Sequence, residues 1–278
     1  MGTLLALGSA ALYGISDFVG GLLSRRAGYL AITVWGYLCG LAFAVAAAVV
    51  VSRTADLDDL AWGALSGVGS GIGTLFLFRG LSHGAMAVVV PISAVCGMGI
   101  PVLVGVLVGG ERPSVLAWVG VAVALPALWL VAGASDGSGR RPTAALDGLA
   151  AGVGIALQYA ALAQADAESG IWPVAAGRAA AVVALLPLVF FRPASVSLSL
   201  PPRIAAGAGA TIVMAVLALI AYQVAAQLDL DVVAVVLSSL YPVVPVALGI
   251  VVLHERPSRR QTLGLAGAGA SIAMLVAR

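Results

Sequence analysis

The sequence predicts an all-α integral membrane protein, with ten transmembrane helices arranged as two five-helix inverted-topology repeats around a central cavity. The first reason is composition. Of the 278 residues, 62% are hydrophobic and only 9% are charged, whereas soluble domains carry about 25% charged residues. The mean hydropathy is +1.11. So few charges could not cover the surface of a soluble fold, so most of the outer surface must face lipid.

The second reason is a series of ten apolar segments, each long enough to cross a bilayer, which needs roughly 20 residues of helix. They lie at residues 3–23, 31–51, 60–81, 85–108, 115–133, 146–165, 172–191, 204–225, 231–253 and 261–277. The longest polar stretch between them, ASDGSGRRPT, falls at the midpoint. We therefore place a first repeat at 1–134, a linker at 135–145 and a second repeat at 146–278.

The third reason is a short motif that occurs twice. The chain reads GERPS at 110–114 and HERPS at 254–258, a spacing of 144 residues that also aligns Pro101 with Pro245. Five helices is an odd number, so the second half must cross the bilayer in the opposite sense to the first. Inverted repeats of this kind are an architecture of secondary transporters. A duplicated five-helix unit without transport activity would show the same spacing.

The first and third segments follow from their residue patterns. No charged residue precedes the apolar stretch of the first segment, so a retained helix is expected rather than a cleaved signal. In the third segment, Gly63, Gly67 and Gly71 recur every four residues and share one helix face, with Gly69 and Gly73 on a neighbouring strip. Strips without side chains predict close contact with partner helices. GVGSGIG lacks the spacing of a nucleotide-binding loop.

Prolines mark the fourth and ninth segments, which carry Pro91, Pro101, Pro242 and Pro245. Each proline removes a backbone hydrogen bond, and free carbonyls in a membrane are tolerated mainly where they face protein or a wet cavity. We interpret the two helices as cavity walls and hinges. Static kinks that only improve packing are the alternative.

No enzyme signature is present. Glu111 and Glu255 are expected on turns at opposite membrane faces, too far apart to cooperate, and are interpreted as helix-terminus and hinge residues. The chain has two histidines and neither a GxSxG nor an HExxH motif. Cys39 and Cys96 lie in apolar runs without metal-ligand or CxxC spacing. All fourteen basic residues are scattered arginines, which argues against nucleic-acid binding.

Two longer stretches carry a resemblance to a known family. PISAVCGMGIPVLVGVLVGGERPSVLAWVG (91–120) and LSSLYPVVPVALGIVVLHERPSRRQTLGL (237–265) resemble the two EamA repeats of the drug/metabolite transporter superfamily, in which a Pro-containing helix, a Gly-Glu or His-Glu hinge and a Gly-rich helix close each half. FLFRGLSHGAMAVVVPIS resembles its passage from helix 3 to helix 4, and YGISDFVGGLLSRR its first helix. The resemblance implies ten helices, a central cavity and no cofactor. Members move amino acids, nucleobases, vitamins, quaternary amines and drugs, so the substrate stays open.

Two ionisable residues are the main candidates for function. Asp17 lies about fourteen residues into the first segment, and a charge near the bilayer centre costs several kcal/mol. Burial disfavours the charged form of a carboxyl, which suits a proton carrier or an anchor for a cationic substrate. A helix-end residue hydrogen-bonded to its neighbours is the alternative. Arg178, in the seventh segment, can pair with Asp17, clamp a substrate carboxylate or snorkel to the interface.

Further polar or aromatic side chains within the spans are expected to line the cavity: Tyr13, Trp35, Gln158, Tyr159, Tyr222, Gln223 and Tyr241. At the end of the third segment, Arg79 is expected to snorkel and His83 to be a satisfied polar group. No metal site is expected.

The function predicted from these features is secondary active transport of small metabolites or drugs across a bacterial-type plasma membrane, by alternating access. We expect proton coupling and export of amino acids or amine-like compounds. A passive facilitator or channel is the alternative. The expected partners are a small-molecule substrate, protons and the lipid bilayer, with the protein a monomer or homodimer.

The arginines near the span ends predict the orientation. Nine lie in the loops that follow the first, fifth, seventh and ninth segments, and three lie on the opposite side. The positive-inside rule then places both termini outside the cell, whereas the family resemblance implies termini in the cytoplasm.

Overall fold

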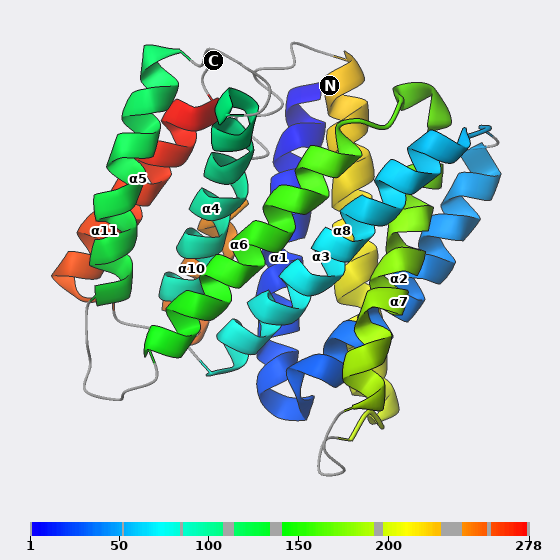
Figure 1. Ribbon diagram of the computed structural model, residues 1–278. Helices are drawn as coiled ribbons and strands as arrows, with labels where there is room; N and C mark the ends of the chain where they lie inside the picture. The colour runs from blue at the N-terminus through cyan, green and yellow to red at the C-terminus, as the bar shows by residue number, and fades with distance from the viewer. Residues whose placement is uncertain are drawn as a thin grey trace.

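The computed structural model describes residues 2–51, 53–83, 86–107, 114–133, 141–191, 197–228, 241–254 and 257–276. In these residues the chain forms ten α-helices and one short 3-10 helix, η1 (Ala167–Ser169), without a strand (Figure 1). The α-helices are α1 (Gly2–Ala27), α2 (Tyr29–Val51), α3 (Leu57–His83), α4 (Met86–Leu107), α5 (Val115–Gly133), α6 (Arg141–Leu162), α7 (Trp172–Phe190), α8 (Pro202–Leu228), α10 (Val243–Val252) and α11 (Arg259–Val276). For the described residues, the prediction of an all-helical chain with ten helices is confirmed, while the inverted repeat stays a prediction.

Local chemistry explains several helix ends. After α1, Gly28 has a φ of +81°, a left-handed conformation that glycine adopts without strain. Asp58 and Asp59 lie in the first turn of α3, where carboxylates favour a helix N-terminus. α6 begins at Arg141, within the stretch predicted as linker. Of the ninth predicted segment, residues 231–240 lie outside the described residues, and α10 follows Pro242.

Five helical segments of the described chain are long and apolar enough to cross a membrane: Tyr29–Val51, Leu57–His83, Thr143–Leu162, Trp172–Phe190 and Pro202–Ala221. Large apolar side chains cover their outer faces, since Val50 is 82% exposed on α2 and Phe190 is 76% exposed on α7. Water would be a poor solvent for such surfaces and lipid a good one. The chain is therefore a multi-pass membrane protein, and crossing by the other helices stays a prediction.

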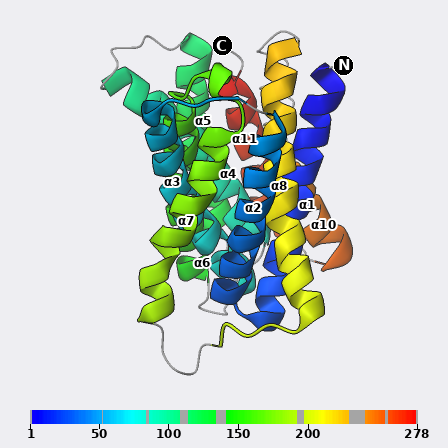
Figure 2. The ribbon, with the colours of Figure 1, turned by 90° about the vertical axis from the view of Figure 1, so that its right-hand side faces the viewer.

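Helices from the two predicted halves interleave. α3 packs against α6 and α7, and α8 packs against α1 and α2 (Figures 1 and 2). The hydroxyls of Ser9 and Ser16 on α1 donate to the carbonyls of Ala218 and Thr211 on α8, at 2.7 Å in each case, so these two helices run antiparallel. Both chain ends lie on the same side of the bundle (Figure 1).

The glycines of α3 allow close approach on two sides, as the sequence predicts. A Cβ atom on Gly63, Gly67 or Gly71 would meet α7, and a Cβ atom on Gly69 or Gly73 would meet α6. At Gly67 the added atom would overlap a backbone carbonyl, so no larger residue fits without moving a helix. This contact matters for the site because polar side chains flank it.

The predicted hinge prolines lie within or beside helices. Pro91 and Pro101 belong to α4, which is continuous from Met86 to Leu107. Pro242 precedes α10 and Pro245 lies in its first turn, and both are buried. Their role as hinges stays a prediction. Two predicted hinge residues lie outside the described residues, Glu111 and Glu255.

Candidate functional site

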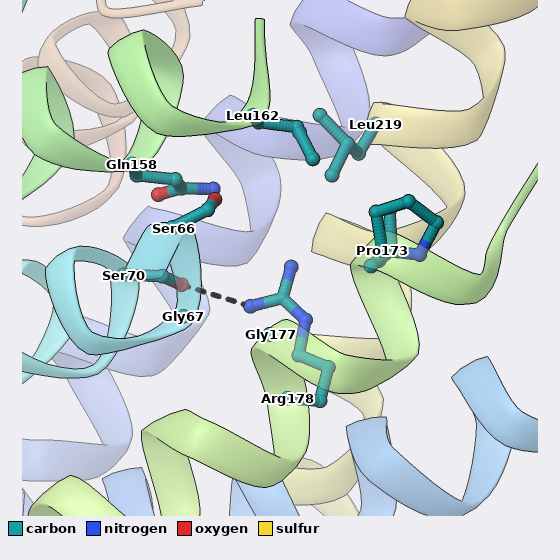
Figure 3. A pocket seen from close by; sticks show the side chains of 10 residues that line it. Ser66, Gly67, Ser70, Gln158, Leu162, Pro173, Gly177, Arg178 and Leu219 are labelled. Atoms are coloured by element: carbon teal, nitrogen blue, oxygen red, sulfur yellow. Dashed lines mark hydrogen bonds between the residues drawn. The ribbon is translucent and has the colours of Figure 1, made fainter. Parts of the chain in front are cut away.

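A buried arginine is the centre of the candidate site. Arg178 lies on α7, about 9 Å along the helix from Trp172 at 1.5 Å per residue, and is 4% exposed. Its Nη1 donates a hydrogen bond of 3.0 Å to Oγ of Ser70 on α3 (Figure 3). Its guanidinium carbon lies 5.3 Å from the centre of the Tyr37 ring, in a cation–π contact. Its Nε has no hydrogen-bond partner among the described residues.

Hydroxyl groups connect this arginine to two further helices. Tyr37 on α2 is fully buried, and its hydroxyl lies 2.6 Å from Oγ of Ser70 and 2.9 Å from Oγ1 of Thr74. Ser70 therefore accepts a hydrogen bond from Arg178 while it shares a second one with Tyr37. The short chain of polar groups joins α7, α3 and α2 in the interior of the bundle.

Backbone contact between α3 and α7 brings these polar groups within reach. Gly67 lies one turn before Ser70, and Gly177 directly precedes Arg178. A Cβ atom on Gly67 would overlap the carbonyl oxygen of Gly177, so the two backbones touch here. The glycine strip of α3 thus sets the distance between the serine and the arginine.

A small pocket lies beside the guanidinium, where α3, α6, α7 and α8 meet (Figure 3). Its lining residues are Ser66, Gly67, Ser70, Gln158, Leu162, Pro173, Val174, Gly177, Arg178 and Leu219. The cavity volume of about 10 Å³ is room for roughly one water molecule. In this conformation the pocket is closed to a metabolite.

A second polar group surrounds Asp17 on α1. The Asp17 side chain keeps part of its surface exposed although it lies in the middle of the helix. The rings of Tyr13, one turn earlier, and Tyr241 have centres 6.0 Å apart and are tilted by 53°. Tyr13 is within electrostatic range of both Asp17 and Arg178, and Tyr241 is within range of Asp17. The Tyr13 hydroxyl is buried and makes no hydrogen bond to the described residues.

The structure thus brings several of the predicted cavity residues together. Gln158 lines the pocket with Arg178. Tyr159 and Tyr13 both pack against the buried cluster that includes Ala44, Val174 and Val216. Pairing of Arg178 with Asp17, one of the alternatives read from the sequence, is not observed, because in the described part of the chain the arginine bonds Ser70 instead. The side chains of two predicted residues on α8 lie outside the description, Tyr222 and Gln223.

Trp35 lies apart from this site. It is 39% exposed, and its indole Nε1 donates to the carbonyl of Leu198 at 2.9 Å. Tyr37, two residues later, is the α2 residue that reaches the site, because two residues of helix correspond to a rotation of about 200°. Sequence reasoning missed Ser66 and Ser70, although their spacing of four residues beside the glycine strip was a usable signal.

Arg79 forms an ion pair, which corrects the expectation that it snorkels. Its Nε and Nη2 both donate to Oδ1 of Asp147 on α6, at 2.9 and 2.5 Å, and its guanidinium also lies over the Phe76 ring. Asp147 is 3% exposed. A buried carboxylate holds the arginine in place, so the pair joins the end of α3 to the beginning of α6. His83 is exposed, with Nδ1 2.9 Å from the carbonyl oxygen of Arg79.

The fold and the site together define a multi-pass membrane protein with a polar pocket buried between its helices. Among the described residues, no three His, Cys, Asp or Glu side chains gather as a metal site requires. Residues 1–133 match the model of the EamA-like transporter family. This part of the chain is thus similar to an EamA-like unit, which agrees with the resemblance carried by the motifs before residue 134. The resemblance at 237–265 lies outside the match and stays a prediction. Members of that family are membrane transporters.

A solved structure supports the fold assignment. One crystal structure of a protein with 20% identical residues matches 100% of this chain and 98% of its own, with a TM-score of 0.61. Similarity at this level of identity shows the fold alone. A comparison with curated protein sequences finds no match.

Proposed function

We propose that the chain is a secondary active transporter that moves small polar metabolites by alternating access, coupled to protons, and that it exports amino acids or amine-like compounds across the plasma membrane. One observation carries the proposal. Arg178, Ser70 and Tyr37 come from three helices of both predicted halves and meet inside a bundle with an apolar exterior. Polar groups within a membrane are costly, so their convergence favours a substrate and ion site.

The closed pocket favours a carrier over an open channel. A cavity of about 10 Å³ holds roughly one water molecule, so a metabolite enters only when helices separate. Some of the contacts that join the helices here are hydrogen bonds between side chains, such as Tyr37 with Ser70. Water or a polar substrate can replace such bonds with little net change in free energy.

The packing of the helices supports an inverted repeat. The spacing of 144 residues aligns α3 with α8, and α6 and α7 with α1 and α2. α3 packs against α6 and α7, and α8 packs against α1 and α2, so the two aligned helices contact corresponding partners. An inverted repeat of this kind would place the polar groups between two halves, as alternating access requires.

The proposal is tested by flux in proteoliposomes of the purified full chain. Radiolabelled amino acids and amines are offered with and without an imposed pH gradient, and a protonophore is added as the control. We expect uphill accumulation of at least one solute that collapses with the gradient. Flux that only equalises concentrations at every pH gradient would identify a passive facilitator instead.

A further inference from the structure

We propose that Arg178 is an anion-binding residue and that the substrates are small molecules with a carboxylate group. The inference rests on the proposed transport function and narrows its substrate class. Simple amines are then excluded from the proposed substrates, and carboxylic acids and amino acids remain. Arg178 acts here as a binding residue that contacts the substrate directly.

The donors of the guanidinium are largely unused. An arginine carries five N–H donors in a planar fork. In the part of the chain that the structure describes, one nitrogen, Nη1, donates to Ser70, the Tyr37 ring lies beside the group, and Nε is without a partner. The residue is only 4% exposed, and within the described residues it has no carboxylate partner. A cation buried without a counter-ion is strongly unfavourable, so a bound anion would relieve the site.

Arg79, near the end of α3, is an informative comparison because its guanidinium also contacts a second helix, α6. Its guanidinium makes two hydrogen bonds to one carboxylate, that of Asp147, although its side chain is 41% exposed. The more buried arginine is therefore the one without a carboxylate. This difference is expected if the missing partner of Arg178 arrives with the substrate, because a carboxylate matches the guanidinium fork in geometry and charge.

The pocket beside Arg178 has two chemically different ends. Ser66, Ser70 and Gln158 supply hydroxyl and amide groups near the guanidinium, while Leu162 and Leu219 lie across from it (Figure 3). When the helices separate and the pocket widens, this division suits a small aliphatic acid, with its carboxylate on the polar side and its carbon chain on the apolar side.

The test uses matched acids and amides that differ only in the charged group. Isovalerate is compared with isovaleramide, and L-leucine with L-leucinamide, by calorimetric titration and thermal shift of the purified full chain. In the wild type the acids should bind more tightly than the amides. Arg178→Gln should weaken acid binding by roughly tenfold to a hundredfold, the usual effect of losing a hydrogen bond to a charged group, and should remove the preference. Arg178→Lys keeps the positive charge but not the planar fork of donors, so its affinity for the acids should lie between those of the wild type and Arg178→Gln.

Arg26→Gln is the matched control, because Arg26 is exposed in the last turn of α1, and it should keep the preference. Acids that bind no better than amides to the wild type would overturn the inference. So would a preference that survives in folded Arg178→Gln, or inorganic phosphate that binds as tightly as the acids. If amines are transported with the proton gradient and the acids do not inhibit that flux, the proposed transport function stands. The inference that the substrates are carboxylates is then wrong. If acids bind through Arg178 but no solute is transported, the proposed transport function is wrong and the carboxylate-binding site stands.

Discussion

Gly67 on α3 and Gly177 on α7 touch through their backbones, and a Cβ atom on Gly67 would overlap the carbonyl oxygen of Gly177. Ser70 lies one turn from the first glycine and Arg178 directly after the second, so the same contact sets the hydrogen bond of 3.0 Å between them. Helix packing and site geometry therefore depend on the same two residues.

Gly67→Ala should consequently damage both stability and function. The added methyl group has no free space, and overpacking of this kind costs roughly 1–3 kcal/mol. We expect a lower thermal midpoint in detergent and slower flux in proteoliposomes. Gly269→Ala is the control, because Gly269 is exposed on α11 and nothing lies near its added Cβ atom. Equal thermal midpoints for the two variants would show that α3 and α7 are not in contact at Gly67.

The Arg79–Asp147 pair should stabilise the α3–α6 contact. Arg79→Gln leaves a buried carboxylate without its partner, and we expect a loss of roughly 1–3 kcal/mol, moderated because the arginine is 41% exposed. The double variant Arg79→Gln with Asp147→Asn removes both charges and should recover much of that loss. Thermal unfolding of the single and double variants measures the coupling. Additive losses would contradict a direct pair.

The positions of the helices were predictable because they depend on the chain itself. Apolar segments long enough to cross a bilayer are separated by polar residues, and this pattern predicted each of the ten helices. The close contacts of α3 were also predictable, since glycines four residues apart, such as Gly63 and Gly67, must share a helix face. Both inferences need only local spacing.

The partners of individual polar residues were not predictable, because they depend on how the helices rotate and pair. Trp35 and Tyr37 are two residues apart, yet only Tyr37 reaches the site. Arg79 finds a carboxylate 68 residues away on another helix, and no local pattern indicates that contact. Sequence spacing thus locates polar residues along a helix but not around the bundle.

The orientation in the membrane can be tested with a single cysteine. The end of α1 and the beginnings of α6, α8 and α11 lie at one end of the bundle, opposite the two chain ends (Figure 1). Arg25, Arg26, Arg141, Arg259 and Arg260 belong to these helix ends, so the positive-inside rule predicts chain termini outside the cell.

The measurement uses a variant with Cys39→Ala and Cys96→Ala and a cysteine in place of Arg278. A membrane-impermeant maleimide should label it in intact cells. Labelling that requires permeabilised cells would place the termini in the cytoplasm, as the family resemblance implies.

Asp17→Asn tests proton coupling directly. Asparagine keeps the shape and hydrogen-bonding capacity of the side chain but cannot take up or release a proton at this site, so the variant should fold normally. Accumulation driven by a pH gradient should collapse in proteoliposomes. Counterflow exchange should survive if Asp17 only carries protons, and it should be lost if the carboxylate also holds a cationic group of the substrate. Asp58→Asn, at an exposed carboxylate in the first turn of α3, is the matched control and should accumulate substrate as the wild type does. A folded Asp17→Asn protein that still concentrates substrate with an unchanged pH profile would remove Asp17 from the mechanism, with His83 as the next residue to substitute.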